Sequence, residues 1–255
     1  MMEKTDIPFL SVSQLSELIK SRQVSPVEVV EAYLERIDRL NDQLYAYLTV
    51  CRDQAVEAAR ELEQELARGE YRGPLHGVPV AVKDQLNTAG IRTTCGTPIF
   101  NDYVPDEDAT VIAKLKSAGA ILLGKLNMTE FGTTSLSHAF ATARNPWDLE
   151  RFTGGSSSGS GGATAACMCA TSLGEDTGGS VRGPAAPKIE PDPIIDCKES
   201  SHRNRAGLTT SFSLASAPAL SICCGFTSEN LPIGLQIGGK PFAEQMVLNV
   251  AYAYQ

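Results

Sequence analysis

Two clusters of glycine and serine, residues 154–162 and 178–180, are the part of the sequence best suited to chemistry. Glycine lets the backbone adopt positive φ or come very close to another group, and serine adds a hydroxyl that both donates and accepts. The Ala-rich run at residues 163–172 predicts a loop, a buried helix, a short strand and a second loop. This arrangement could bring two hydroxyls and several backbone N–H groups to one point. A flexible Gly/Ser linker is the alternative, but apolar, structured sequence flanks the clusters on both sides.

A nucleophilic serine needs a base, and the sequence has three histidines for that role, His76, His138 and His202. Residues 155–159 match the G-x-S-x-G nucleophile elbow of α/β-hydrolases, which follows directly on a strand. Residues 146–153 lack the alternation of a strand, so the sequence disfavours the elbow. The sequence also lacks the Gly-Lys-Ser/Thr of a phosphate-binding loop and the spaced ligand residues of a metal site.

A lysine can replace histidine as the base for a serine. Its pKa must then fall by about three units from about 10.4, which corresponds to roughly 4 kcal/mol, and desolvation acts in that direction. Lys83 is the best-placed lysine, because it ends the apolar run 78–82, which is typical of a buried strand. The alternative is that Lys83 reaches solvent through its aliphatic stem. Asp84 would oppose the fall in pKa unless its side chain points elsewhere on the strand.

Three motifs together identify the chain as similar to a known family. VPVAVKD, GGSSSGS and LGEDTGGSVRGPA, in this order, resemble the amidase signature family, and the likeness extends to about residue 186. The resemblance implies an α/β fold in which a mixed β-sheet core is flanked by helices. It also implies cleavage of a carbon–nitrogen amide bond without a metal or another cofactor.

The resemblance further implies a Ser–Ser–Lys triad that works through an acyl-enzyme. Ser180 corresponds to the nucleophile, Ser156 to the serine that passes the proton, and Lys83 to the base. In the family, a cis peptide bond precedes the bridging serine, which here is the bond between Gly155 and Ser156.

The resemblance also assigns residues around the triad. The backbone N–H groups that resemble the oxyanion hole are those of Thr177, Gly178, Gly179 and Ser180. The residues expected to support the substrate or the loops are Gly155, Ser157, Asp176 and Arg182. For Asp176 and Arg182 we favour an ion pair that braces the loop. Ser157, Ser158 and Ser160 are expected to cap the following helix.

The chain departs from the family in two places. Family members are nearly twice as long, and residues 187–205, with three prolines and many charges, stand where they continue. We therefore expect a single truncated domain over residues 1–255, with an irregular junction at 187–205 in place of central strands and much of the substrate pocket. The deletion is either natural or a product of gene modelling. Glu175 is the second departure, because many relatives carry a small hydroxyl residue there.

The composition of the chain argues against some classes of binding partner. The net charge of −8 provides no basic surface for direct binding of nucleic acid. No stretch is long and apolar enough to span a bilayer, and the N-terminus lacks the layout of a signal peptide. The sequence therefore predicts a cytoplasmic protein. The seven cysteines lack the spacing of a disulfide framework, which predicts buried free thiols.

The remaining segments predict a layered α/β domain, because helices and strands alternate. Helices are expected to begin at the capping boxes of Ser11 and Ser25, with Val27, Val30, Leu34, Ile37 and Leu40 on one face of the second helix. Further helices are expected at 53–67, 108–117 and 241–255. Strands are expected at 44–50, 78–82, 120–123 and on both sides of 228–230.

Three functions fit these residues. The first is an amidase that acts on a small-molecule amide, alone or as a homodimer. The second is the glutaminase subunit of a tRNA-dependent amidotransferase for Glu-tRNA(Gln) or Asp-tRNA(Asn), which needs partner subunits. The third is a truncated, inactive member of the family.

Overall fold

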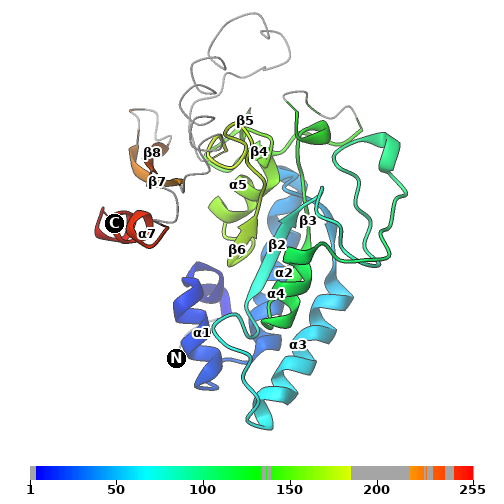
Figure 1. Cartoon of the computed structure of the whole chain (residues 1–255), viewed down its shortest axis with the longest axis vertical. Helices are drawn as coiled ribbons and strands as arrows, with labels where there is room; N and C mark the ends of the chain where they lie inside the picture. Colours follow the sequence, from blue (N-terminus) through cyan, green and yellow to red (C-terminus); the bar gives the residue numbers. More distant parts are fainter. Residues whose placement is uncertain are drawn as a thin grey trace, which may run out of the picture.

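A mixed four-stranded sheet forms the centre of the fold (Figure 1). The computed structural model of the chain describes residues 4–133, 136, 139–184, 219–226, 228, 232–238 and 244–254. The strands, in their order across the sheet, are β1 (Tyr47–Val50), β3 (Ile121–Leu126), β2 (Pro79–Lys83) and β6 (Thr171–Leu173). β2 runs parallel to β3 and β6, and β1 runs antiparallel to β3. The predicted fold class, a mixed sheet flanked by helices, is confirmed.

Helices pack around this sheet (Figure 1). They are α1 (Val12–Lys20), α2 (Pro26–Leu44), α3 (Arg52–Ala67), α4 (Thr110–Ser117) and α5 (Ser158–Ala165). Three 3-10 turns add to them at Lys4–Phe9, Pro98–Phe100 and Glu130–Gly132. The long helices α2 and α3 pack against each other, and both contact β3.

Capping residues determine where α1 and α2 begin. The Ser25 hydroxyl accepts the Glu28 N–H at 3.1 Å, and the Glu28 carboxylate accepts the Ser25 N–H at 2.8 Å. Pro26 takes the first turn, where its missing N–H costs nothing. Ser11 and Gln14 form the same reciprocal pair before α1. Both predicted capping boxes are confirmed.

The main core lies between α2, α3 and the sheet. On α2, the predicted face is confirmed: Val30, Leu34 and Ile37 are buried, and Val27 and Leu40 pack against the core at its margin. The core residues that β3 contributes are Ile121, Leu123 and Leu126. Burial of these side chains stabilises the fold by roughly 25 cal/mol for each Å² of apolar surface removed from water.

The structure corrects three expectations about local elements. The strand expected at 44–50 begins only at Tyr47, because α2 continues to Leu44 and ends at Tyr45 in the left-handed region, with φ 50°. The helix expected in the Ala-rich run begins five residues earlier, at Ser158, inside the glycine–serine cluster. Residues 148–152, which lack the alternation of a strand in the sequence, form strand β5 (Asp148–Phe152), paired with β4 (Arg144–Asn145).

Close backbone contact explains the glycine at position 159 of α5, despite the low helix propensity of that residue. A Cβ atom on Gly159 would lie 2.3 Å from the Ala46 carbonyl oxygen and 2.4 Å from the Asn127 nitrogen. The Gly159 N–H donates to the Asn127 carbonyl at 2.8 Å. Only glycine therefore lets α5 lie directly on the end of β3.

The last described elements are β7 (Ala219–Phe226), β8 (Pro232–Gly238) and α7 (Glu244–Tyr254). β7 and β8 pair antiparallel, and α7 packs on them, so the predicted pair of strands and the terminal helix are confirmed. The predicted junction at 187–205 lies outside the described residues, and the single domain over 1–255 stays a prediction. No helix within the described ranges is long and apolar enough to cross a membrane.

Two glycines of α5 make a matched test of this packing. We expect Gly159→Ala to lower the free energy of unfolding by about 2 kcal/mol or more, because backbone atoms cannot yield to the added methyl group. Gly162→Ala should leave stability unchanged or raise it by up to about 1 kcal/mol, since its nearest neighbour would be Thr153 Oγ1 at 3.5 Å. Urea denaturation followed by circular dichroism measures both. Equal stability of the two variants would contradict the packing described for α5.

Candidate active site

Lys83 is a buried lysine at the end of a buried strand. All five residues of β2 are buried, and the Lys83 side chain has no exposed surface. Its Nζ atom donates to Ser156 Oγ at 2.6 Å and to the Glu175 carbonyl oxygen at 3.5 Å. The alternative in which Lys83 reaches solvent is therefore wrong.

Ser156 contacts Lys83, and the next residue, Ser157, bonds to the loop that follows β6. The peptide bond between Gly155 and Ser156 is cis, and the Ser156 carbonyl accepts the Thr129 N–H at 3.1 Å. The Ser156 side chain is buried. The backbone bond from Thr129 thus fixes Ser156 in a position from which its hydroxyl contacts Lys83.

Ser180 is partly exposed, and its backbone connects the two glycine–serine clusters. The Ser180 carbonyl accepts the Ser157 N–H at 2.9 Å. The Ser180 hydroxyl has no hydrogen-bond partner within the described part of the chain. The two clusters therefore meet through their backbones, but no hydrogen bond joins the hydroxyls of Ser156 and Ser180 among the described residues.

Asp176 and Arg182 brace the loop that carries Ser180. The Arg182 guanidinium donates to both Asp176 oxygens, at 2.9 and 2.6 Å. The same carboxylate accepts the N–H groups of Gly179 and Val181, at 2.7 and 2.9 Å. Burial raises the pKa of Asp176, but the hydrogen bonds from Arg182 and the backbone outweigh it and hold that pKa well below its usual range. The favoured interpretation, an ion pair that supports the loop, agrees with this geometry.

The brace changes the set of predicted oxyanion donors. Because the Gly179 N–H donates to Asp176, the prediction that this group is free is wrong for this structure. The Asp176 side chain folds back on its own loop, as short acidic side chains often do. The backbone N–H groups of Thr177 and Ser180 have no acceptor among the residues that the structure describes.

The serines that precede and open α5 do not cap it. Ser157 Oγ donates to the Glu175 carbonyl at 3.1 Å and has no capping bond to the helix. Ser158 and Ser160 donate to the carbonyls of Asn127 and Leu173, at 3.3 and 3.2 Å. The capping expectation is wrong, because these hydroxyls fasten α5 to neighbouring segments.

The buried position of Ser157 also bears on the nucleophile elbow. Ser157 would be the nucleophile of that motif, yet its side chain has no exposed surface and is hydrogen-bonded. A strand does precede it, but β5 belongs to a two-stranded hairpin outside the central sheet. His138 and His202 lie outside the described residues, and His76 contacts the Leu62 carbonyl through Nε2 at 2.9 Å. The geometry therefore favours Ser156 and Ser180 over Ser157.

Burial dominates the electrostatics of Lys83. It lowers the pKa of the Lys83 ammonium below its ordinary value, and the carboxylates of Glu175 and Asp176 raise that pKa in part. Asp84, which the sequence placed beside Lys83, accepts the Thr94 N–H at 2.9 Å and lies 3.7 Å from Lys125 Nζ. Its side chain therefore points away from Lys83, as the argument from the sequence required.

Lys125 is a second buried lysine, which the sequence reasoning missed. It neighbours Val82 across β2 and β3, and its Nζ donates to the Leu86 carbonyl and to Thr93 Oγ1, both at 2.6 Å. Burial lowers the pKa of Lys125 to about 8, although Asp84 opposes this. Lys125 ends an apolar run just as Lys83 does, so the same signal could have found it.

Gly132 is the other neighbour of the site that the sequence did not indicate. It has φ +70°, and a Cβ atom on it would lie 3.6 Å from Ser156 Oγ and 3.3 Å from Gln85 Oε1. No local pattern marks this glycine, because its role arises from the way the turn folds over Ser156.

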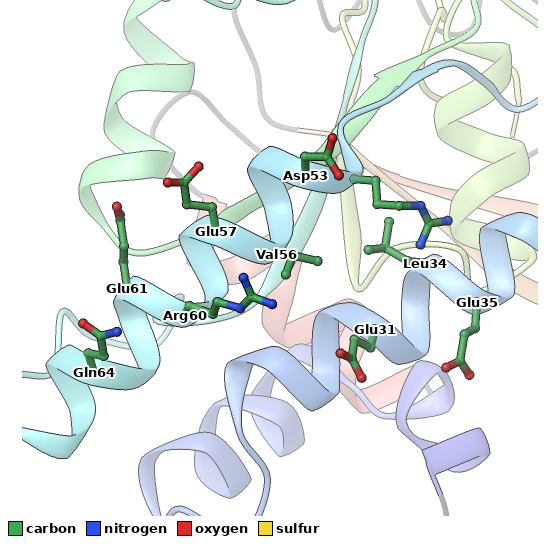
Figure 2. Close-up of a pocket in the computed structure, with 10 residues that line it drawn as sticks. Glu31, Leu34, Glu35, Asp53, Val56, Glu57, Arg60, Glu61 and Gln64 are labelled. Atoms are coloured by element: carbon green, nitrogen blue, oxygen red, sulfur yellow. The ribbon is translucent and has the colours of Figure 1, made fainter.

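A groove separate from the Lys83 site is lined mostly by charged side chains (Figure 2). It has a volume of about 880 Å³ and opens between α2 and α3. The side chains that line it are Glu31, Leu34, Glu35, Arg52, Asp53, Val56, Glu57, Arg60, Glu61 and Gln64. They are mostly charged, and none belongs to the Lys83 site.

Comparisons with known proteins agree with the motifs. The family model Amidase matches residues 28–188. Over 183 residues the chain is 49% identical to the A subunit of glutamyl-tRNA(Gln) amidotransferase from Carboxydothermus hydrogenoformans and 47% identical to that from Moorella thermoacetica. Each alignment covers 71% of this chain and 38% of the relative.

A solved structure agrees with the fold. The peptide amidase of Stenotrophomonas maltophilia is 34% identical, with a TM-score of 0.66, over 69% of this chain and 38% of that one. The chain thus spans only 38% of the length of these relatives, and the shared part contains Lys83, Ser156 and Ser180.

The buried pair of Lys125 and Asp84 gives a prediction about stability. Lys125→Met leaves the Asp84 carboxylate buried without a counter-charge, so we expect the free energy of unfolding to fall by about 3–5 kcal/mol. Adding Asp84→Asn to this variant should restore part of the loss. Urea denaturation near neutral pH measures the three proteins. If the free energy of unfolding of Lys125→Met lies within about 1 kcal/mol of the wild-type value, the pair does not support the fold.

Proposed function

This chain belongs to the amidase family, and on that premise we propose that it cleaves a carbon–nitrogen amide bond through an acyl-enzyme on Ser180. The observation that carries the proposal is the 2.6 Å contact between Lys83 Nζ and Ser156 Oγ, made by a lysine without exposed surface. A lysine in such a place can lose its proton at lower pH than a lysine in water. It can then act as a base for a serine.

The first step is a proton relay. Neutral Lys83 takes the proton of the Ser156 hydroxyl, and Ser156 takes that of Ser180. The Ser180 oxygen attacks the carbonyl carbon of the amide, and the carbonyl oxygen becomes an oxyanion. The partly exposed position of Ser180 supports this role. The hydroxyls of Ser156 and Ser180 form no hydrogen bond within the described residues, so the relay requires them to move into contact.

The second step needs donors for the oxyanion and a proton for the leaving amine. We assign the oxyanion to the backbone N–H groups of Thr177 and Ser180, in a loop that Asp176 and Arg182 hold in shape. A contribution from the Gly178 N–H stays a prediction. The amine departs with the proton that Lys83 returns through Ser156. Water then attacks the acyl carbon, and the same relay restores the Ser180 hydroxyl.

A glutaminase role is the second candidate, and the 49% identity to the A subunit of an amidotransferase favours it. In that case the amide is the side chain of glutamine, and the ammonia passes to partner subunits. Release of ammonia from glutamine but not from simple aliphatic amides would support this candidate. Because the chain spans 38% of that relative, a third candidate is an inactive protein that keeps the triad without a working pocket.

Labelling with a fluorophosphonate probe tests the triad, because the probe needs an activated serine and no natural substrate. We expect the folded protein to be labelled at Ser180 and Ser180→Ala not to be labelled. Lys83→Met should slow labelling by about 10²–10⁴-fold, the usual contribution of a general base. The site of labelling is read by mass spectrometry of the digested protein.

The matched control is Lys114→Met, which removes an exposed lysine of α4. It should be labelled at the wild-type rate. Thermal unfolding of each variant shows whether it is folded. A cooperatively folded wild-type protein that is not labelled at Ser180 would contradict the amidase and glutaminase proposals and favour the inactive one.

A further inference from the structure

Glu175 places a carboxylate against the proposed base, and neither the triad nor its braces account for it. We infer that Glu175 is a positioning residue that competes with Ser156 for the Lys83 ammonium and thereby sets the pH above which Ser180 becomes reactive. This inference rests on the proposed function, because it concerns the proton on the same lysine.

The geometry holds this carboxylate in place. Glu175 Oε2 lies 3.4 Å from Lys83 Nζ, and Oε1 accepts the Thr177 hydroxyl at 2.6 Å. The Glu175 backbone is bound on both sides to Ser157 Oγ, through its N–H at 3.3 Å and its carbonyl at 3.1 Å. Both carboxylate oxygens therefore have defined partners, although 37% of the Glu175 side chain is exposed.

The other charges around Lys83 are already paired. Asp176, from the same loop, is bound by Arg182, and Asp84, next to Lys83 on β2, faces Lys125 of β3. Helix α5 contains no titratable side chain. Within the described residues, Glu175 forms its only ion pair with Lys83.

Beside the Glu175 carbonyl oxygen at 3.5 Å, the ammonium thus has a hydroxyl and a carboxylate as competing acceptors. A hydroxyl accepts a hydrogen bond from Lys83 whether or not the lysine is charged, but a carboxylate stabilises only the charged form. Glu175 therefore keeps Lys83 protonated to higher pH than burial alone would. Since the relay needs neutral Lys83, labelling of Ser180 should rise with pH through the pKa of Lys83, and removal of the carboxylate should move this rise to lower pH.

Glu175→Gln tests the inference, because it removes the charge and keeps the shape and an acceptor for Thr177. The rate of fluorophosphonate labelling at Ser180 is measured as a function of pH. We expect the midpoint to fall by at least about one pH unit, the usual effect of one neighbouring charge. Labelling below the midpoint should then be about tenfold faster than in wild type.

Two further variants make the test specific. Glu175→Ser removes the same charge without the amide and should shift the midpoint in the same direction, so that the result does not depend on one variant folding well. Glu130→Gln removes a carboxylate from the nearby Glu130–Gly132 turn. The Glu130 carboxylate forms no ion pair with any described residue. This variant should leave the midpoint unchanged.

The outcomes separate this inference from the proposed function. Labelling at Ser180 with an unchanged or raised midpoint in both Glu175 variants would overturn the role of Glu175 and leave the amidase proposal standing. A folded wild-type protein without labelling at any pH would overturn both. A lowered midpoint in Glu130→Gln as well would show a general effect of charge and would also overturn the inference.

Discussion

The hydrogen bond between a buried lysine and a buried serine is the constraint on which the site depends. An ammonium group is stabilised by water far more than by an apolar interior, so the fold must either neutralise Lys83 or supply partners for it. The structure supplies one hydroxyl at 2.6 Å, one carboxylate at 3.4 Å and one backbone carbonyl at 3.5 Å. The Ser156 hydroxyl stabilises the charged form of Lys83 less than a carboxylate would. The proposed proton transfer depends on this difference, because it needs neutral Lys83. The backbone bonds of Ser156 to Thr129 and of Ser157 to Ser180 hold the Ser156 side of this contact in place.

Two lysines at the ends of adjacent strands show how the same burial serves different purposes. Lys125 has a carboxylate at 3.7 Å and two further acceptors, so its hydrogen bonds hold the segment that follows β2. Lys83 faces the glycine–serine loops, where its partner Ser156 can itself exchange a proton. The pair of Lys125 and Asp84 also removes one carboxylate from the surroundings of Lys83. The sheet therefore carries two buried lysines on adjacent strands, one paired with a carboxylate and one hydrogen-bonded to a hydroxyl.

Sequence reasoning reached the parts of this structure that depend on local patterns. The capping boxes at Ser11 and Ser25 and the apolar run before Lys83 each carry their signal within a few residues, and the structure agrees with them. The start of α5 at Ser158 could not be predicted, because Gly159 is required by contact with Ala46 and Asn127, next to β1 and β3, rather than by helix propensity. Tertiary packing likewise decided that Ser157 bonds to the loop after β6 instead of capping α5. These signals arise only when distant segments meet.

The central claim is that the fold withdraws the Lys83 ammonium from water, and its titration tests that claim most directly. With lysine side chains labelled by ¹³C and ¹⁵N, the Lys83 signal can be assigned by its loss in Lys83→Met and followed by NMR as the pH rises. We predict a pKa below the ordinary lysine value of 10.5, because burial outweighs the nearby carboxylates. A pKa at or above 10.5 would mean that Lys83 stays charged and that the relay through Ser156 does not operate.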